Sequence, residues 1–342
     1  MSGRLVAMLA AAASFLAFVG PAPYSFAQQE KPFTMGYSVG FLTDPFQAIQ
    51  VDLTMEAARK AGLKTLPVAN ANGDPGKQIT DFHNLIAEGA QGLITVPTDS
   101  DAIVPALNFA ASQNVPVVDI DIGPAGGKVA MIVRADNIRM GEDACHLIGG
   151  ALHGKGTVLS MMGDQATTNG RDRTTGFADC MKTDYPAIVL IQRPTYWKTD
   201  KATAVAQTVV TATPGLSAIY MQSDSVMLAG VLNVLKSAGK LTKVGDANHI
   251  MLVSIDGTPL ALQSIRAGLL DAAISQPLDL YVKYGLYYLQ GAVAGEKFHT
   301  GPTDHNSHIV TYKGNLMDLL PAPIVTIANA SDPLLWGNKV KP

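Results

Sequence analysis

Residues 33–62, FTMGYSVGFLTDPFQAIQVDLTMEAARKAG, contain the unit that decides the fold. The segment Phe33–Val39 is short and rich in β-forming side chains, and it predicts a strand. A helix is predicted over Phe46–Ala61, because apolar residues recur on one helical face and Gly62 follows as a stop. A strand that is followed at once by a helix is the first half of the unit from which parallel sheets are built.

The same alternation of strand and helix continues along the rest of the chain. Up to residue 134, further strands are expected at 64–69, 91–96, 115–120 and 129–133, with helices at 75–88 and 101–113. Beyond it, helices are expected at 138–152, 170–182, 199–212, 223–238, 258–267 and 278–294, and strands at 157–161, 188–191, 218–221, 250–255 and 271–275. Strict alternation is typical of parallel sheets covered by helices on both faces. We therefore predict an α/β fold with two doubly wound parallel-sheet lobes.

Residues 1–27 have the pattern of a secretory signal peptide. A basic start at Arg4 precedes the uncharged, Ala-rich run Leu5–Val19, and Ser25–Ala27 ends on a small residue. We predict cleavage near Ala27-Gln28 and a soluble periplasmic protein. The alternative is a membrane anchor, which is less favoured because the apolar run is short for a bilayer and no stop-transfer pattern follows.

Length, composition and net charge limit the number of domains and the classes of partner that we expect. About 315 residues remain after the predicted signal peptide, which is more than one hydrophobic core usually holds. Hydrophobic residues make up 47% and charged residues 15% of the chain, a globular composition. The net charge of −3 gives no reason to expect nucleic acid or an anionic membrane as a partner.

Patterns for catalysis, cofactors and metals fail on inspection. Gly149–Lys155 has the G-x4-G-K spacing of a phosphate loop, but Gly156 stands where Ser or Thr would hold magnesium, and the run precedes a strand. His299, His305 and His308 have no acidic or thiol partner in metal-ligand spacing. We therefore expect no enzymatic activity, no cofactor and no metal.

The two cysteines, Cys145 and Cys180, are predicted to form one disulfide. Export permits the bond chemically. Both residues fall on predicted helices that flank the first strand of the second series, so they could approach each other. Two buried free thiols are the alternative.

Polar and aromatic side chains gather where the predicted strands end. Ligands of doubly wound sheets bind outside the carboxyl ends of the strands, so the residues that follow each strand form the candidate site. The residues in these positions include Asp44, Phe46, Asp121, Arg171, Trp197, Ser223, Asp256 and Gln276, of which Asp256, Arg171, Trp197 and Gln276 are the hardest to explain as caps. Asp and Ser at such positions also cap helices, which is our interpretation of Asp99, Ser100, Asp101 and Asp224. Capping requires neither an indole nor a guanidinium.

The chemistry of this set suits a polyhydroxylated ligand. A hydroxyl group both donates and accepts, so carboxylates and amides can accept its hydrogen bonds while an arginine donates. An aromatic face can pack on the C–H face of a sugar ring. Every unpaired hydroxyl of an enclosed ligand is costly, and this cost gives selectivity.

These motifs, in this order and spacing, resemble the ribose-binding branch of the type I periplasmic sugar-binding proteins over about Phe33–Thr311. The resemblance rests on Asp44-Pro45-Phe46, Pro97-Thr98-Asp99-Ser100-Asp101-Ala102, Asp136-Asn137, Arg171-Asp172-Arg173-Thr174-Thr175-Gly176-Phe177, Asp256-Gly257-Thr258-Pro259 and Gln276. It implies an N-terminal lobe of residues 33–135 plus 277–305, and a C-terminal lobe and tail of residues 136–276 plus 306–342. Three hinge strands near Arg134–Asn137, Ser275–Pro277 and Asp304–Ser307 would join the lobes.

The resemblance also implies roles for the candidate residues. Phe46 and Trp197 would sandwich a sugar ring, and Asp44 would contribute from the first loop. The hydroxyl groups would be bonded by Asp121, Arg171, Asp256 and Gln276. The implied function is a receptor that captures a small sugar or polyol and delivers it to the membrane permease of an ABC importer, and we expect a monomer. A ligand receptor for a chemotaxis or quorum-signal sensor is the alternative, and an enzyme on the same fold is disfavoured.

Three positions depart from the ribose-binding pattern. Ile122 replaces an arginine, Val96 replaces an asparagine, and Ser223 replaces another asparagine. We therefore expect a ligand other than ribose, with fewer or differently placed hydroxyl groups, such as a deoxy sugar, a branched sugar or a short polyol. The chain also extends past the family's usual end, and Pro321–Pro323 and Trp336 are expected to lie against the surface with no assigned role.

Overall fold

The computed structural model describes residues 32–340. The predicted signal peptide and its cleavage point lie outside these residues. Within the described part, no helix has the length and apolar character that crossing a membrane requires.

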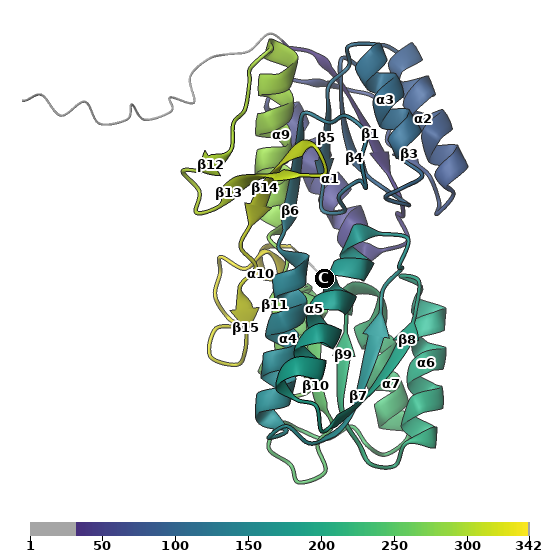
Figure 1. Cartoon of the computed structure of the whole chain (residues 1–342), viewed down its shortest axis with the longest axis vertical. Helices are drawn as coiled ribbons and strands as arrows, with labels where there is room; N and C mark the ends of the chain where they lie inside the picture. Colours follow the sequence, from purple (N-terminus) through teal and green to yellow (C-terminus); the bar gives the residue numbers. More distant parts are fainter. Residues whose placement is uncertain (1–31, 341–342) are drawn as a thin grey trace, which may run out of the picture. The chain divides into compact units, whose positions relative to one another are not determined.

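The first sheet carries the N-terminal half of the alternating pattern (Figure 1). Its strands follow the order β12-β13-β14-β6-β5-β4-β1-β2, and β3 also pairs with β1. Their bounds are β1 Thr34–Val39, β2 Lys64–Thr65, β3 Ala69–Asn70, β4 Gly92–Val96, β5 Val117–Ile120, β6 Met131–Ala135, β12 Gly301–Pro302, β13 His308–Tyr312 and β14 Asn315–Leu320. The covering helices are α1 Pro45–Lys60, α2 Pro75–Ala87, α3 Val104–Ser112 and α9 Leu278–Ala294. Helices α1 and α9 pack together, as do α2 and α3, so both faces of the sheet are buried.

The second sheet has the order β15-β11-β10-β9-β7-β8. Its strands are β7 Gly156–Met162, β8 Ile188–Pro194, β9 Leu216–Met221, β10 Met251–Asp256, β11 Ala272–Ser275 and β15 Ile324–Val325. The helices are α4 Asn137–Ala151, α5 Thr168–Asp184, α6 Thr199–Ala212, α7 Asp224–Ser237, α8 Pro259–Arg266 and α10 Trp336–Lys339. Strands β7 to β11 are all parallel, and β15 is antiparallel to β11. The predicted fold of two parallel-sheet lobes is confirmed.

Three segments connect the two sheets. The first lies between β6 and α4, and the second lies between β11 and α9, both close to the predicted hinges. The third lies between β14 and β15, at Pro321–Pro323, and not at Asp304–Ser307 as predicted. The extended, donor-poor backbone of prolines suits such a linker.

The position of the third connection corrects the predicted lobe boundary at residue 306. Strand β14 pairs in parallel with β6, from Met317 opposite Ile132 to Leu320 opposite Ala135. Strands β13 and β14 form a hairpin whose turn contains Lys313 and Gly314, both with positive φ. Residues 308–320 therefore belong to the first sheet, because long-range pairing with β6 decides where this hairpin lies.

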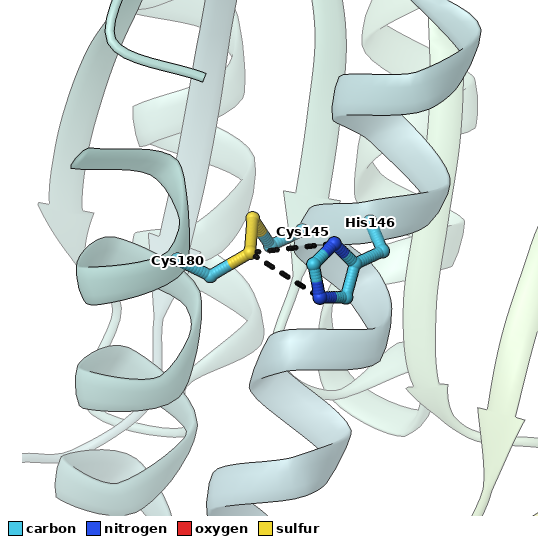
Figure 2. Close-up of side chains that lie close together, drawn as sticks. All are labelled: Cys145, His146 and Cys180. Atoms are coloured by element: carbon cyan, nitrogen blue, oxygen red, sulfur yellow. Dashed lines mark hydrogen bonds between the residues drawn. A yellow bond between two sulfur atoms is a disulfide. The ribbon is translucent and has the colours of Figure 1, made fainter. Parts of the chain in front are cut away.

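The predicted disulfide joins α4 to α5. The Sγ atoms of Cys145 and Cys180 are bonded, with their Cα atoms 6.2 Å apart. The His146 imidazole lies beside them, 3.8 Å from the Cys180 sulfur to Nδ1 (Figure 2). The three side chains have the composition of a metal site, but the bonded sulfurs are not thiolates and lack the form in which cysteine binds zinc. Close packing of these helices requires Gly176, where a Cβ atom would come within 2.1 Å of the Ile138 carbonyl oxygen.

Candidate functional site

A pocket lies among segments that follow the strands of both sheets. The lining consists of Asp44, Phe46, Gln47, Asp121, Ile122, Asn169, Arg173, Trp197, Ser223, Asp256 and Gln276. Seven of the eight predicted site residues are in this set, and the exception is Arg171.

Arg171 lies outside the pocket, and Arg173 takes the place predicted for it. The Arg171 side chain is 35% exposed and donates to the Gln165 carbonyl over 2.9 Å. Arg173 is 2% exposed. Residues two apart on a helix point to different sides, so only one of the two can face the pocket. Phe177, fully buried and four residues after Arg173, is the sequence signal that identifies the inward face of α5.

The Arg173 guanidinium is held from several directions but keeps one free donor. Its Nε donates to Asn137 Oδ1 over 2.7 Å, and its Nη1 donates to the Gln222 carbonyl and lies 3.8 Å from Asp256 Oδ1. Its Cζ lies 5.7 Å from the centroid of the Trp197 ring. Within the described residues, the buried Nη2 has no hydrogen-bond partner. A buried donor without a partner is costly, so a ligand acceptor would satisfy it.

Asp256 is the most heavily bonded carboxylate of the pocket. Its Oδ2 accepts from Ser223 Oγ over 2.6 Å and from the Ser225 amide, and its Oδ1 accepts from Gln276 Nε2 over 2.8 Å. The loop after it is held by Asp224, which accepts from the Gly257 amide and from Thr258. Asp224 was expected to cap a helix; instead it fixes the turn that presents Asp256.

Asp121 and Asp44 reach the pocket from the first sheet. Asp121 Oδ1 accepts from Asn169 Nδ2 over 2.8 Å. Asp44 caps α1 by accepting from the Phe46 amide, and the same oxygen accepts from Ser225 Oγ over 2.7 Å. Asn169 was not predicted, because the predicted helix began at residue 170, whereas α5 begins at Thr168.

Burial and like charge shift the acids of the pocket toward the protonated form. Burial, together with the charge of Asp256, raises the pKa of Asp44 to about 7. Burial also raises the pKa of Asp121 to about 6, although the Arg173 charge opposes the rise. The pKa of Asp256 is raised by burial against the same opposition from Arg173. The carboxylates therefore outnumber the positive charge available to them.

Two aromatic side chains line the pocket and are fixed by their surroundings. Trp197 donates from Nε1 to Thr167 Oγ1 over 3.2 Å, and its ring lies so close to Gly163 that a Cβ there would be 1.8 Å away. Phe46 meets the edge of Trp336, with ring centroids 5.5 Å apart. Trp336 was expected to lie against the surface with no assigned role, but it is buried and its Nε1 donates to the Asp256 carbonyl over 2.9 Å. The C-terminal segment thus supports both an aromatic wall and a pocket carboxylate.

Backbone geometry marks the same positions. Asp121, Trp197 and Asp256 all have positive φ, at 68°, 54° and 116°. Non-glycine residues rarely adopt such values, and they concentrate at functional sites. Six further non-glycine residues of the described chain have positive φ outside the lining, so this geometry accompanies the pocket but is not confined to it.

Loops of the two sheets touch around the pocket. The Thr168 amide donates to Ser100 Oγ over 3.0 Å, and Arg134 pairs with Asp172 at 2.9 Å. Asp99 accepts from the Asp101 amide over 2.8 Å within a turn, and it does not cap a helix as predicted, because α3 begins only at Val104. Ser100, by contrast, contributes to the contact between the two sets of loops. The arrangement is that of two lobes closed on each other.

Comparison with known proteins agrees with this architecture. Residues 35–297 match the model of a periplasmic binding protein domain. The ribose import binding protein RbsB of Bacillus subtilis is 31% identical over 269 residues, covering 78% of this chain and 84% of that protein. A xylitol-binding protein of Mycolicibacterium smegmatis is 25% identical over 278 residues, covering 77% of each. A solved ABC transporter solute binding protein from Mycobacterium smegmatis, with bound glycerol, has a TM-score of 0.77 at 23% identity and covers 89% of this chain and 97% of its own. The chain belongs to the periplasmic binding protein family.

Proposed function

We propose that this chain is an extracytoplasmic receptor that captures a small sugar or polyol between two closing lobes and delivers it to the permease of an ABC importer. The observation that carries the proposal is the pocket itself. Carboxylates, amides and an arginine whose Nη2 has no partner line this pocket together with the aromatic side chains of Phe46 and Trp197. Relatives named for binding ribose and xylitol support the ligand class.

The polar groups of the pocket match the needs of hydroxyl groups. Arg173 Nη2 offers a donor, and the carboxylate oxygens of Asp121 and Asp256 offer acceptors beside it. Ile122 supplies an apolar wall, which favours a ligand that carries a C–H or methyl group at that position. We therefore propose that ribose is not the preferred ligand, and that binding occurs without turnover.

The two arginines of α5 provide a matched test. A protein of residues 28–342 is first screened by thermal shift against sugars and polyols. The ligand that gives the largest shift is then titrated by calorimetry. Arg173→Met should weaken binding by about 30-fold or more, because it removes a buried charged donor. Arg171→Met changes the same residue type on the same helix and should leave affinity within about twofold. Equal effects from both substitutions, or no thermal shift with any sugar or polyol, would refute the proposed pocket.

A further inference from the structure

The pocket is lined by more negative than positive groups. Its described lining contains three carboxylates, from Asp44, Asp121 and Asp256, and one guanidinium, from Arg173. When ionised, these groups carry a formal charge of −2. The nearby Arg134 opposes the rise in the pKa of Asp121, but it is paired with Asp172 at 2.9 Å, so the two together add no net charge to this count.

The three carboxylates are not equally provided with partners. Asp256 lies 3.8 Å from the Arg173 guanidinium and accepts from Ser223 and Gln276. The hydrogen bonds of Asp44 and Asp121 come from neutral groups, namely an amide, a hydroxyl and an asparagine. Bringing like charges together away from water is costly unless a cation compensates them.

The hydrogen-bonding groups of the lining also favour a positively charged donor on the ligand. An ionised carboxylate only accepts hydrogen bonds. Among the charged groups of the lining, three carboxylates accept and only the Arg173 guanidinium donates, whereas the amides of Gln47, Asn169 and Gln276 both donate and accept. A hydroxyl group supplies one donor, whereas an ammonium group supplies three donors, no acceptor and a positive charge.

We propose that the ligand is a small amino sugar or amino polyol, whose ammonium group lies between Asp44 and Asp121. This inference rests on the proposed function and names its substrate class. The remaining hydroxyl groups would meet Asp256, Gln276 and Arg173 Nη2. The formal charge of the pocket would then fall from −2 to −1 on binding, which lowers the cost of burying these acids.

The test compares ligands that differ only at the amine. D-glucosamine, D-galactosamine and an amino-inositol are each titrated beside the parent hydroxyl compound, and the two hexosamines also beside their N-acetyl forms. At least one amine should bind ten times or more tighter than its parent, and its N-acetyl form, where it has one, should bind more weakly than the amine. Acetylation removes the charge while it keeps the nitrogen.

Substitutions then assign the preference to the two carboxylates. In Asp44→Asn and Asp121→Asn, the ratio of parent to amine dissociation constants should fall below about three. Asp99→Asn is the control, because Asp99 lies in a turn outside the pocket, and it should leave the ratio unchanged.

Two results would overturn the inference and can be told apart. If neutral sugars or polyols bind tighter than their amines, the amine preference is refuted and the sugar receptor stands. If neither the amines nor the neutral compounds bind, the proposed function fails as well.

Discussion

The two halves of the pocket are built differently. In the second-sheet half, Asp256 accepts hydrogen bonds from Ser223, Ser225 and Gln276, all of which follow strands of the same sheet. In the first-sheet half, the carboxylates of Asp121 and Asp44 reach across to Asn169 and Ser225 of the other half. The second-sheet half is therefore preorganised by bonds within its own sheet's loops, whereas the first-sheet half depends on bonds that cross the pocket.

The difference assigns separate tasks to the two halves. A preorganised half can hold a ligand at low entropic cost before the lobes meet. We expect the half that bonds across the pocket to stabilise a closed state, because bonds between two lobes require that the lobes meet. Substitutions in the second-sheet half should therefore lower affinity most, and those at the contacts across the pocket should act on closure.

The largest effect is expected from Asp256→Ala. The substitution removes the acceptor of three hydrogen bonds and leaves the buried Arg173 without its nearest carboxylate in the pocket. Loss of one partner from a buried charged pair costs about 2–5 kcal/mol, so affinity should fall by roughly 30-fold or more. Calorimetry with the ligand that gives the largest thermal shift measures the change. Asp99→Ala should stay within about twofold, and the reverse order of effects would place the ligand elsewhere.

The fold and most of the pocket could be predicted because both follow from local pattern. Alternation of strands and helices determines a parallel sheet, and the carboxyl ends of its strands determine where ligands bind. Asp121 and Asp256 come directly after β5 and at the end of β10, so their place in the sequence sufficed.

The errors all concern relations that a local pattern does not contain. To place Arg173 and not Arg171 in the pocket, one must know which face of α5 points inward. The predicted helix began at residue 170, two residues after the observed start at Thr168, and it did not identify that face. The third connection depends on pairing between β14 and β6, about 180 residues apart in the chain. Trp336 packs against Phe46 and the Asp256 carbonyl through tertiary contacts of the C-terminal segment.

A second prediction concerns the stability of the unliganded protein, which the buried charge of Asp44 should lower. Because the pKa of Asp44 is about 7 when folded and near 3.8 when unfolded, the folded state binds more protons between these values. Stability against unfolding should therefore fall as pH rises from about 4 to 7, and the loss is complete above the folded pKa. Asp44 is partly exposed, so we expect its share to be roughly 2 kcal/mol.

Urea unfolding of the wild type and the Asp44→Asn variant, at pH 4.5 and pH 8, measures this share. Asparagine can still cap α1, so the substitution mainly removes the charge. The variant should gain about 2 kcal/mol relative to the wild type between the two pH values. If the difference in unfolding free energy between variant and wild type is the same at both pH values, Asp44 has an ordinary pKa. Its charge would then not destabilise the first-sheet half of the pocket.

The smallest effect is expected at the ion pair between Arg134 and Asp172, which connects the two halves at 2.9 Å. Asp172 is partly exposed, and such pairs contribute about 0.2–1 kcal/mol. Asp172→Asn should therefore raise the dissociation constant by up to about fivefold. The change should appear in the dissociation rate, because the pair forms only when the lobes meet. Asp143→Asn is the matched control, since Asp143 pairs with Arg139 within α4 and joins nothing across the pocket. Stopped-flow dissociation that is equally fast in both variants would show that the contacts across the pocket do not hold the closed state.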